Sequence, residues 1–292
     1  MKDDFYSRFE LFFRGTRTEI KARLLTYMPF IEPMLTLYPH AIALDLGCGR
    51  GEWLELLQEK GFQTLGVDLD EGMLDDCRAL NLNVRTQDAI SALQGMENES
   101  ASLVSAFHLI EHIPFETLRL LVSEAYRVLK PGGLLIMETP NPENILVGTS
   151  NFYLDPTHTR PIPPGLLSFI PRDSGFLHIK VLRLQESPSL RNVQSPTLLE
   201  VFGGASPDYA VIAQKSAPQE VLDQFKAAFE VDIGLTFETL SNRYDQALQE
   251  KLHALDALAH AVYQSTSWKI TRPLRFIDAV FKALKRKLKR KS

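Results

Sequence analysis

The sequence has no long hydrophobic run and few cysteines. No apolar run approaches the ~20 residues that a membrane-spanning helix needs, and the first residues, 1–4, lack the apolar core of a signal peptide. The 292 residues include two cysteines, Cys48 and Cys77, too few for a disulfide framework. These absences argue against a membrane-spanning or disulfide-stapled secreted protein, and we expect a chain in the reducing cytoplasm.

Charge is unevenly distributed along an otherwise ordinary composition of 45% hydrophobic and 23% charged residues. Residues 269–292 hold ten Lys and Arg against one acid, Asp278, a net charge of +9 that leaves −13 on the rest of a chain whose total is −4. An acidic body with a basic tail predicts an anionic partner for the tail and argues against general nucleic-acid binding.

Strand and helix patterns alternate through the middle of the chain, which predicts an α/β fold with a parallel sheet and crossover helices. Strands are expected near 42–46, 64–68, 83–86, 102–107 and 133–138, with helices near 51–60, 71–80 and 116–129. Two further strands, near 177–184 and 209–214, could complete the sheet, whereas 140–175 and 187–207 look like loops. The expected organisation is an N-terminal helical cap (1–40), an α/β domain (41–215) and a C-terminal helical region (216–292).

A glycine loop follows the first predicted strand in the run Ile42-Ala43-Leu44-Asp45-Leu46-Gly47-Cys48-Gly49-Arg50-Gly51. Glycines let the backbone approach a ligand closely and adopt positive φ. In a dinucleotide fingerprint, G-x-G-x-x-G, the third glycine would stand at position 52, where this chain has Glu. The glycine comes one residue earlier, and Asp45 just before the loop suits a cationic ligand better than a pyrophosphate.

Carboxylates also end the following strands. Asp68 lies at the tip of the second strand, where a carboxylate can accept both hydroxyls of a ribose, although capping the next helix is the ordinary alternative. Leu69 and Met73 could pack on a flat base. Asp88 and Ala89 follow the third strand, and the turn Leu129-Lys130-Pro131-Gly132-Gly133 precedes the fifth.

These five ordered motifs, over residues 41–140, resemble class I S-adenosylmethionine (SAM) methyltransferases. The resemblance implies SAM as the cofactor and a Rossmann-like sheet with helices on both faces. It places Asp88 at the adenine amino group. The expected cofactor-binding residues are Arg14, Asp45, Gly47, Cys48, Gly49, Gly51, Asp68, Leu69, Met73, Asp88, Ala89 and Phe107. Arg14 or Arg17 could bind the SAM carboxylate, with a solvated helix face as the alternative.

Two histidines follow the fourth strand in the run His108-Leu109-Ile110-Glu111-His112. The H-x-x-E-H spacing is typical of inverted zincins, which need both histidines on one helix. Here His108 ends a strand and no further ligand is indicated, so no metal is assigned, and whether Glu111 and His112 bind one stays open. At the carboxyl edge of the sheet, His108 and His112 are candidate general bases, with core histidines as the alternative.

The loop after the fifth strand, residues 151–161, combines an aromatic, an acid, a histidine and a cation between prolines. Tyr153, Asp155 and Arg160 could stack on a sugar, bond its hydroxyls and pair with phosphate. His158 is a third candidate base. A surface loop capped by Asp155 is the alternative.

The C-terminal region adds two amphipathic patterns. Leu248, Leu252, Leu255, Ala259 and Val262 form a coiled-coil-like seam about two heptads long. The basic tail spaces apolar residues from Ile277 to Leu288 opposite its cations, which predicts contact with an inner-membrane surface or, alternatively, with a partner protein. Upstream, the segment 265–275 resembles one common in bacterial surface-polysaccharide enzymes.

Together these features predict a SAM-dependent methyltransferase that O-methylates a sugar of a membrane-associated glycan, or its nucleotide-sugar precursor, in O-antigen or related lipopolysaccharide biosynthesis. Glycosyltransferases are expected partners through the C-terminal helices, and the location is cytoplasmic, peripheral at the inner membrane. A small-molecule O-methyltransferase of the quinone or natural-product type is one alternative. A non-catalytic protein that uses the same fold to recruit glycan-assembly enzymes is another.

Overall fold

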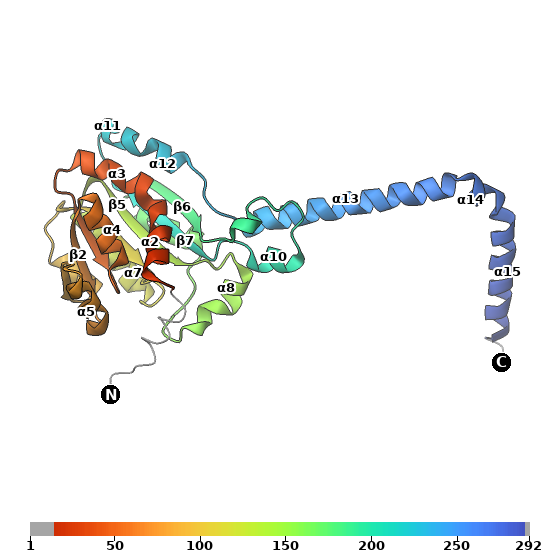
Figure 1. The fold of residues 1–292 in the computed structure, drawn as a ribbon, viewed down its shortest axis with the longest axis horizontal. Helices are drawn as coiled ribbons and strands as arrows, with labels where there is room; N and C mark the ends of the chain where they lie inside the picture. The colour runs from red at the N-terminus through yellow and green to blue at the C-terminus, as the bar shows by residue number, and fades with distance from the viewer. Residues whose placement is uncertain (1–14, 290–292) are drawn as a thin grey trace.

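A single seven-stranded sheet forms the centre of the molecule in the part of the chain that the structure describes (Figure 1). This computed structural model describes residues 15–289, except for the side chains of 283–285 and 287–289. The strand order is β3-β2-β1-β4-β5-β7-β6. Six strands run in the same direction, and β7 runs opposite to them. The strands are β1 (Ile42–Leu46), β2 (Gln63–Asp68), β3 (Val84–Thr86), β4 (Ala101–Phe107), β5 (Leu129–Pro140), β6 (His178–Leu184) and β7 (Asp208–Gln214).

Helices cover both faces of the sheet because the strand side chains alternate between two apolar clusters. In β1, Leu44 and Leu46 belong to one cluster and Ala43 to the other. The first face packs against α6 (Ala89–Gln94), α7 (Phe115–Val128) and α9 (Pro164–Asp173). The second packs against α2 (Arg17–Leu24), α3 (Met28–Leu37), α4 (Glu52–Lys60) and α12 (Lys226–Glu230), and α5 (Glu71–Ala79) packs beside α4.

The predicted Rossmann-like fold is confirmed, and all seven expected strands are present. The longest departure is β5, which begins at Leu129, four residues before its expected start. The prediction of loops over 140–175 and 187–207 was wrong. These stretches contain α8 (Ile145–Thr149), α9 and α10 (Leu198–Gly203), together with short 3₁₀ turns at Asn151–Leu154 and Pro188–Leu190.

Local caps explain two of the missed helices, α8 and α10. The Asn144 side chain accepts the backbone N–H groups of Leu146 and Val147 at the start of α8. Thr197 and Glu200 form a reciprocal capping box at the start of α10. These helices are too short for an apolar period to show in the sequence, so only the cap residues carry the signal.

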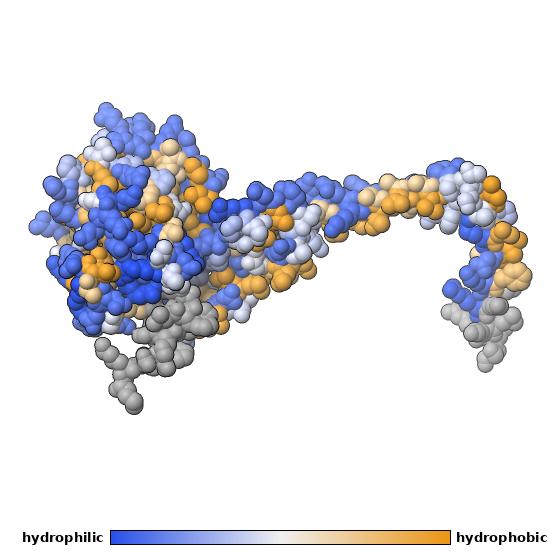
Figure 2. All heavy atoms as spheres, in the orientation of Figure 1, coloured by the Kyte–Doolittle hydropathy of each residue, from blue (hydrophilic) through white to orange (hydrophobic). Residues whose placement is uncertain are grey.

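The C-terminal region is a series of helices that first lies over the sheet and then, from residue 237 on, extends away from it (Figure 1). Its members are α11 (Gln219–Leu222), α12, α13 (Phe237–Gln264), α14 (Thr266–Ile270) and α15 (Arg272–Lys289). Leu240 and Ala247 are buried near the start of α13, whereas the seam residues Leu248, Leu252 and Leu255 are exposed. Apolar side chains also show along α13 and α15 in the space-filling view (Figure 2).

None of the helices in the described residues is both long enough and apolar enough to span a bilayer. The expected helical cap is represented by α2 and α3. The predicted SAM-carboxylate residue Arg14 lies outside the described residues, as do the side chains of Leu284 and Leu288 in the basic tail.

Candidate active site

The glycine loop between β1 and α4 turns the backbone at the carboxyl edge of the sheet. Gly47 and Gly49 have φ values of 69° and 51°, in the region that favours glycine. The N–H groups of Gly47 and Cys48 both donate to the carbonyl of Val67, at 2.8 and 3.0 Å, and tie the loop to β2. A Cβ atom on Gly47 would lie 3.2 Å from Leu109 Cδ1. The loop therefore depends on glycine at this position.

Gly51 has a different role from the predicted cofactor contact. It begins α4 with a φ of 76°, and a Cβ there would lie 2.7 Å from Leu82 Cδ1 and 2.8 Å from Cys77 Sγ. It lines neither of the two cavities described below. Its absent side chain lets the loop pack against α5.

The first cavity, here called the β2 cavity, has a volume of about 370 Å³. Asp68, at the tip of β2, accepts the N–H of Gly49 at Oδ2 and the N–H of Asp70 at Oδ1, both at 2.9 Å. Each carboxylate oxygen keeps a further lone pair for a ligand hydroxyl. Seven predicted cofactor residues line this cavity: Gly47, Gly49, Asp68, Leu69, Met73, Asp88 and Ala89.

Asp88 shares its carboxylate between the cavity and a helix cap. Its Oδ1 accepts the N–H of Ser91 at 2.9 Å at the start of α6. Hydrogen bonds from Ser91 lower the pKa of Asp88, so the group is ionised at neutral pH. A carboxylate in this position can accept a hydrogen bond from the amino group of a base.

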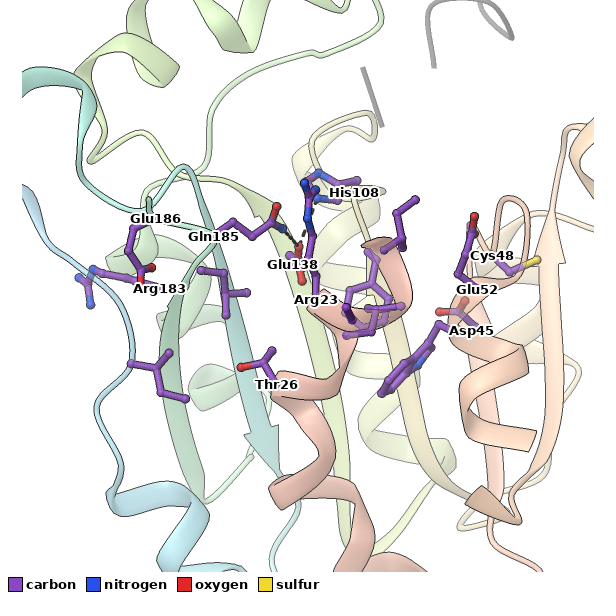
Figure 3. A pocket seen from close by; sticks show the side chains of 18 of the residues that line it. Arg23, Thr26, Asp45, Cys48, Glu52, His108, Glu138, Arg183, Gln185 and Glu186 are labelled. Carbon is purple, nitrogen blue, oxygen red and sulfur yellow. Dashed lines mark hydrogen bonds and ion pairs between the residues drawn. The ribbon is translucent and has the colours of Figure 1, made fainter. Parts of the chain in front are cut away.

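The second cavity, the β5 cavity, has a volume of about 360 Å³ and combines charged and aromatic side chains (Figure 3). Its predicted members are Asp45, Gly47, Cys48 and Phe107. Asp45 is buried and accepts the Ser105 hydroxyl at 2.6 Å. Gly47 and His108 line both cavities, which therefore adjoin at these two residues.

Sequence reasoning missed most of the polar wall of the β5 cavity: Arg23, Thr26, Glu138, Arg183, Gln185, Glu186 and Arg191. Glu138 lies near the carboxyl end of β5, which runs parallel to β4. Because β6 and β5 both pair antiparallel with β7, β6 also ends at this edge, and Gln185 follows it. The carboxyl-edge rule for parallel strands could have marked both residues.

His108 lies between two carboxylates where the cavities meet. Its Nδ1 is 3.2 Å from Glu111 Oε1, and its Nε2 is 3.3 Å from Glu138 Oε1. Burial alone would lower the pKa of His108, but the bonds to Glu111 and Glu138 raise it well above its usual value. With both nitrogens protonated and donating, the ring has no free lone pair, which argues against His108 as the general base.

Glu138 collects several donors in addition to His108. The Tyr27 hydroxyl donates to Oε2. The Gln185 amide donates to Oε1 at 3.2 Å, as Figure 3 shows. Asp208, at the start of β7, is close by, and burial raises its pKa to about 7. The carboxyl edge thus holds three acids, Glu111, Glu138 and Asp208, around the imidazolium of His108.

The other two candidate bases contact each other. The rings of His112 and His158 are 4.7 Å apart between centroids. Burial lowers the pKa of His112, so its ring is neutral at pH 7. His112 lines the β2 cavity, whereas His158 lines neither of the two cavities.

None of the three predicted substrate residues lines either of the two cavities. Tyr153 is 60% exposed and lines neither cavity. The Arg160 guanidinium lies 4.6 Å from the centroid of the Phe115 ring. Asp155 accepts the N–H and the hydroxyl of Thr157, at 2.8 and 2.6 Å, and orders the loop.

Among the N-terminal cations, Arg17 is committed to structure, because it bonds Glu55 at 2.6 Å and the carbonyl of Arg50 at 2.8 Å. Arg23 lines the β5 cavity and has no side-chain hydrogen bond or ion pair with any residue that the structure describes. It is therefore the cation available to a ligand.

The fold and the paired cavities define an α/β enzyme with a nucleotide-type cofactor site at the carboxyl edge of its sheet. Residues 44–137 match the protein family described as "Methyltransferase domain". A solved SAM-dependent methyltransferase from Archaeoglobus fulgidus is 34% identical, with a TM-score of 0.64 over 72% of this chain and 100% of that one.

Curated relatives agree. A probable SAM-dependent methyltransferase of Mycobacterium tuberculosis is 28% identical over 75% of this chain and 76% of its own length. A ubiquinone biosynthesis O-methyltransferase of Methylococcus capsulatus is 33% identical over 34% of this chain and 43% of its own. The chain belongs to the SAM-dependent methyltransferases, and SAM is its cofactor.

The residues present fit this cofactor. The glycine at position 47 leaves room beside Leu109, Asp68 offers carboxylate oxygens to a ribose, and Leu69 and Met73 give an apolar wall for adenine. Asp45 in the adjoining cavity offers negative charge toward a sulfonium. When bound, SAM supplies an electrophilic methyl group for transfer to a nucleophile.

Proposed function

We propose that this enzyme O-methylates a sugar of a membrane-associated glycan or of its nucleotide-sugar precursor, as in O-antigen and related surface-polysaccharide biosynthesis. The observation that carries the proposal is the wall of the β5 cavity, which joins the cofactor site at His108 and Gly47. Hydrogen-bonding groups with an aromatic surface are what a sugar ring requires.

The wall offers each kind of group that such an acceptor would use. Glu138 and Gln185 can bond hydroxyls, and Trp53 and Phe107 pack edge to face, with centroids 5.4 Å apart, beside them. Arg23 makes no side-chain hydrogen bond or close ion pair with any described residue, and it suits a sugar phosphate or carboxylate. A purely apolar acceptor would leave the Arg23 guanidinium desolvated without a hydrogen-bond partner.

Glu138 is the proposed acceptor of the hydroxyl proton. It lines the β5 cavity beside His108, at the junction with the cofactor site. Methyl transfer to a hydroxyl requires alignment of the oxygen and removal of its proton. His108, charged and bonded on both nitrogens, would orient Glu138 and offset the charge of the neighbouring acids.

The C-terminal helices support a location at the cytoplasmic surface of the inner membrane. On α15, Phe276, Ile277 and Phe281 are more than half exposed, and the helix carries an excess of cations. An amphipathic basic helix of this kind binds anionic lipid surfaces. The exposed seam on α13 is the surface that we propose for glycosyltransferase partners.

The test of the acceptor class is transfer of radiolabelled methyl from SAM into membrane fractions of the source cells. Label in the polysaccharide or lipid-linked glycan fraction supports the proposal. Label confined to small lipophilic molecules contradicts it and supports a quinone-type acceptor, the second candidate, which the similarity to ubiquinone biosynthesis O-methyltransferases favours.

The membrane location has its own test. A variant lacking residues 269–292 should lose cosedimentation with liposomes that contain anionic lipid, while the full chain sediments with them. Neutral liposomes are the control, since the electrostatic part of the binding should vanish there. Equal sedimentation of both proteins with anionic liposomes would contradict the role of the tail.

A further inference from the structure

Three potential metal ligands converge where the loop after β5 meets the segment after β4. A carboxylate oxygen of Glu111 and one ring nitrogen each of His112 and His158 all lie within 4.8 Å of one another. The H-x-x-E-H motif lacked a further ligand in the sequence, and His158 lies 46 positions beyond His112. The fold therefore supplies a group that the spacing of the motif could not reveal.

The loop that carries His158 is held against Glu111. Both the backbone N–H and the hydroxyl of Thr159 donate to the Glu111 carbonyl, each at 2.8 Å. The ring of His158 also packs on Phe152, with centroids 4.5 Å apart. The convergence is thus built by main-chain and side-chain contacts on both sides of His158.

The hydrogen-bond partners of His112 and His158 show which ring nitrogen carries the proton. The Phe152 carbonyl can only accept, so His158 Nδ1, at 2.6 Å, is the donor. The Asp155 carboxylate can likewise only accept, so the Thr157 hydroxyl donates its one proton to it. The Thr157 oxygen then accepts from His112 Nδ1 at 2.9 Å.

Because Nδ1 is the donor in both rings, the other nitrogen, Nε2, is the atom that can offer a lone pair to a metal. Histidines that bind metals usually donate their other N–H to a carbonyl, a carboxylate or a group bonded to one. His158 does so directly to a carbonyl, and His112 does so through Thr157 to Asp155. Moreover, His158 Nε2 faces Asp155 Oδ2 at 3.9 Å, so a second carboxylate lies beside the same nitrogen.

The third ligand is a buried carboxylate held in place. Glu111 has no exposed surface, and its Oε2 accepts the Thr139 hydroxyl at 2.9 Å while Oε1 faces His108. Each oxygen has a second lone pair. Acceptor atoms that converge with no donor between them form a site for a cation.

We propose that Glu111, His112 and His158 bind one divalent transition-metal ion. Two imidazoles and one carboxylate suit Zn²⁺, Fe²⁺, Co²⁺ or Mn²⁺ and leave coordination positions open. The site borders the β2 cavity through His112. Glu111 also contacts His108, where the two cavities meet. If the proposed function holds, an acceptor oxygen at this junction would bind the ion, which would lower the pKa of its hydroxyl.

The test is calorimetric titration of the chelator-treated full-length protein with Zn²⁺, Co²⁺ and Mn²⁺ salts alone. The wild type should bind one equivalent. His158→Gln and His112→Gln should each weaken affinity at least 100-fold, and Thr157→Val, which removes the acceptor of His112 Nδ1, about 10-fold. Circular dichroism and SAM affinity report whether each variant is folded.

His260→Gln is the matched control, because His260 is exposed and also faces a carboxylate, Asp256 at 3.3 Å, but has no third ligand in the described structure. It should bind like the wild type. Absence of one-equivalent binding by the wild type, or unchanged affinity in both His112 and His158 variants, would overturn the site.

The role of the ion in methyl transfer has a separate readout. Methyl transfer by metal-free protein that matches that of the loaded protein would refute the acceptor role and leave the site intact. Failure of glycan labelling would refute the proposed function without touching the calorimetric result.

Discussion

The two adjoining cavities differ in how the chain builds them. The β2 cavity comes mainly from residues 47–121, in segments that follow one another along β1, β2, β3 and β4. The β5 cavity is lined by α2, the glycine loop, β5 and the segment after β6. Arg23 and Gln185, 162 positions apart in the sequence, therefore line the same cavity. One cavity is assembled locally and the other by the closure of the whole sheet.

This difference corresponds to the division of labour in a transferase. The locally built cavity fits the cofactor, which is the same for every member of the family, and a short motif suffices to specify it. The cavity built from distant segments faces the acceptor, which differs between enzymes. Variants in the two cavities should therefore separate cofactor affinity from transfer.

The largest effect is expected for Glu138→Gln in the β5 cavity. Loss of the proposed proton acceptor should lower kcat for methyl transfer into the membrane fraction by about 10²- to 10⁴-fold, while the SAM dissociation constant stays within about threefold by calorimetry. Glu99→Gln, an exposed ion-pair partner of Lys215 outside both cavities, is the control and should be near wild type. A Glu138→Gln enzyme with normal kcat would remove this residue from the chemistry.

Asp68→Ala should produce the opposite pattern in the β2 cavity. The ribose hydroxyls lose their acceptor, and the N–H groups of Gly49 and Asp70 lose theirs. Unpaired polar groups cost about 1–3 kcal/mol, equivalent to a SAM affinity lower by roughly 5- to 150-fold. Calorimetry measures the SAM affinity, and Asp76→Ala, at an exposed position, is the control. Equal SAM affinities of Asp68→Ala and the wild type would end the assignment of the ribose to Asp68.

Arg23→Gln tests whether the β5 cavity is reserved for the acceptor. An exposed charge pair contributes up to about 1 kcal/mol, so the amount of membrane extract needed for half-maximal transfer should rise about fivefold. SAM affinity should not change. If SAM affinity falls instead, Arg23 binds the cofactor carboxylate, and the division between the cavities is less sharp than the geometry suggests. Arg119→Gln, on the exposed face of α7, is the control.

Prediction from sequence succeeded where the signal is local. The positions of most strands follow from apolar runs, and Asp68 and Asp88, which lie at the carboxyl ends of β2 and β3, line one cavity. It failed for Arg23, because no short pattern shows that α2 lies at this edge of the sheet. It also missed Glu138, although the position of this residue near the carboxyl end of β5 could have marked it. It failed for His158 too, since only the bonds between Thr159 and Glu111 bring that loop to the histidine motif.

The smallest predicted effect concerns how the free energy of unfolding depends on pH through Asp208, which lies beside His108 and Glu138. Burial raises the pKa of Asp208 from 3.8 to about 7. Between these values the folded protein holds a proton that the unfolded chain has released, so the free energy of unfolding falls as pH rises through this window. Asn cannot ionise, so Asp208→Asn should lose this fall.

Urea unfolding at pH 5 and pH 7 measures the difference. The midpoint should drop between these pH values in the wild type and drop less in Asp208→Asn. His108 contributes a fall of the same sign above about pH 6.5, because its folded pKa is raised, and that part remains in both proteins. Asp232→Asn, at an exposed carboxylate whose pKa the Lys180 bond lowers, should keep the wild-type response. An equal drop in midpoint from pH 5 to pH 7 in Asp208→Asn and the wild type would show that Asp208 is ionised throughout this range. The cluster of acids around His108 would then hold one more anion.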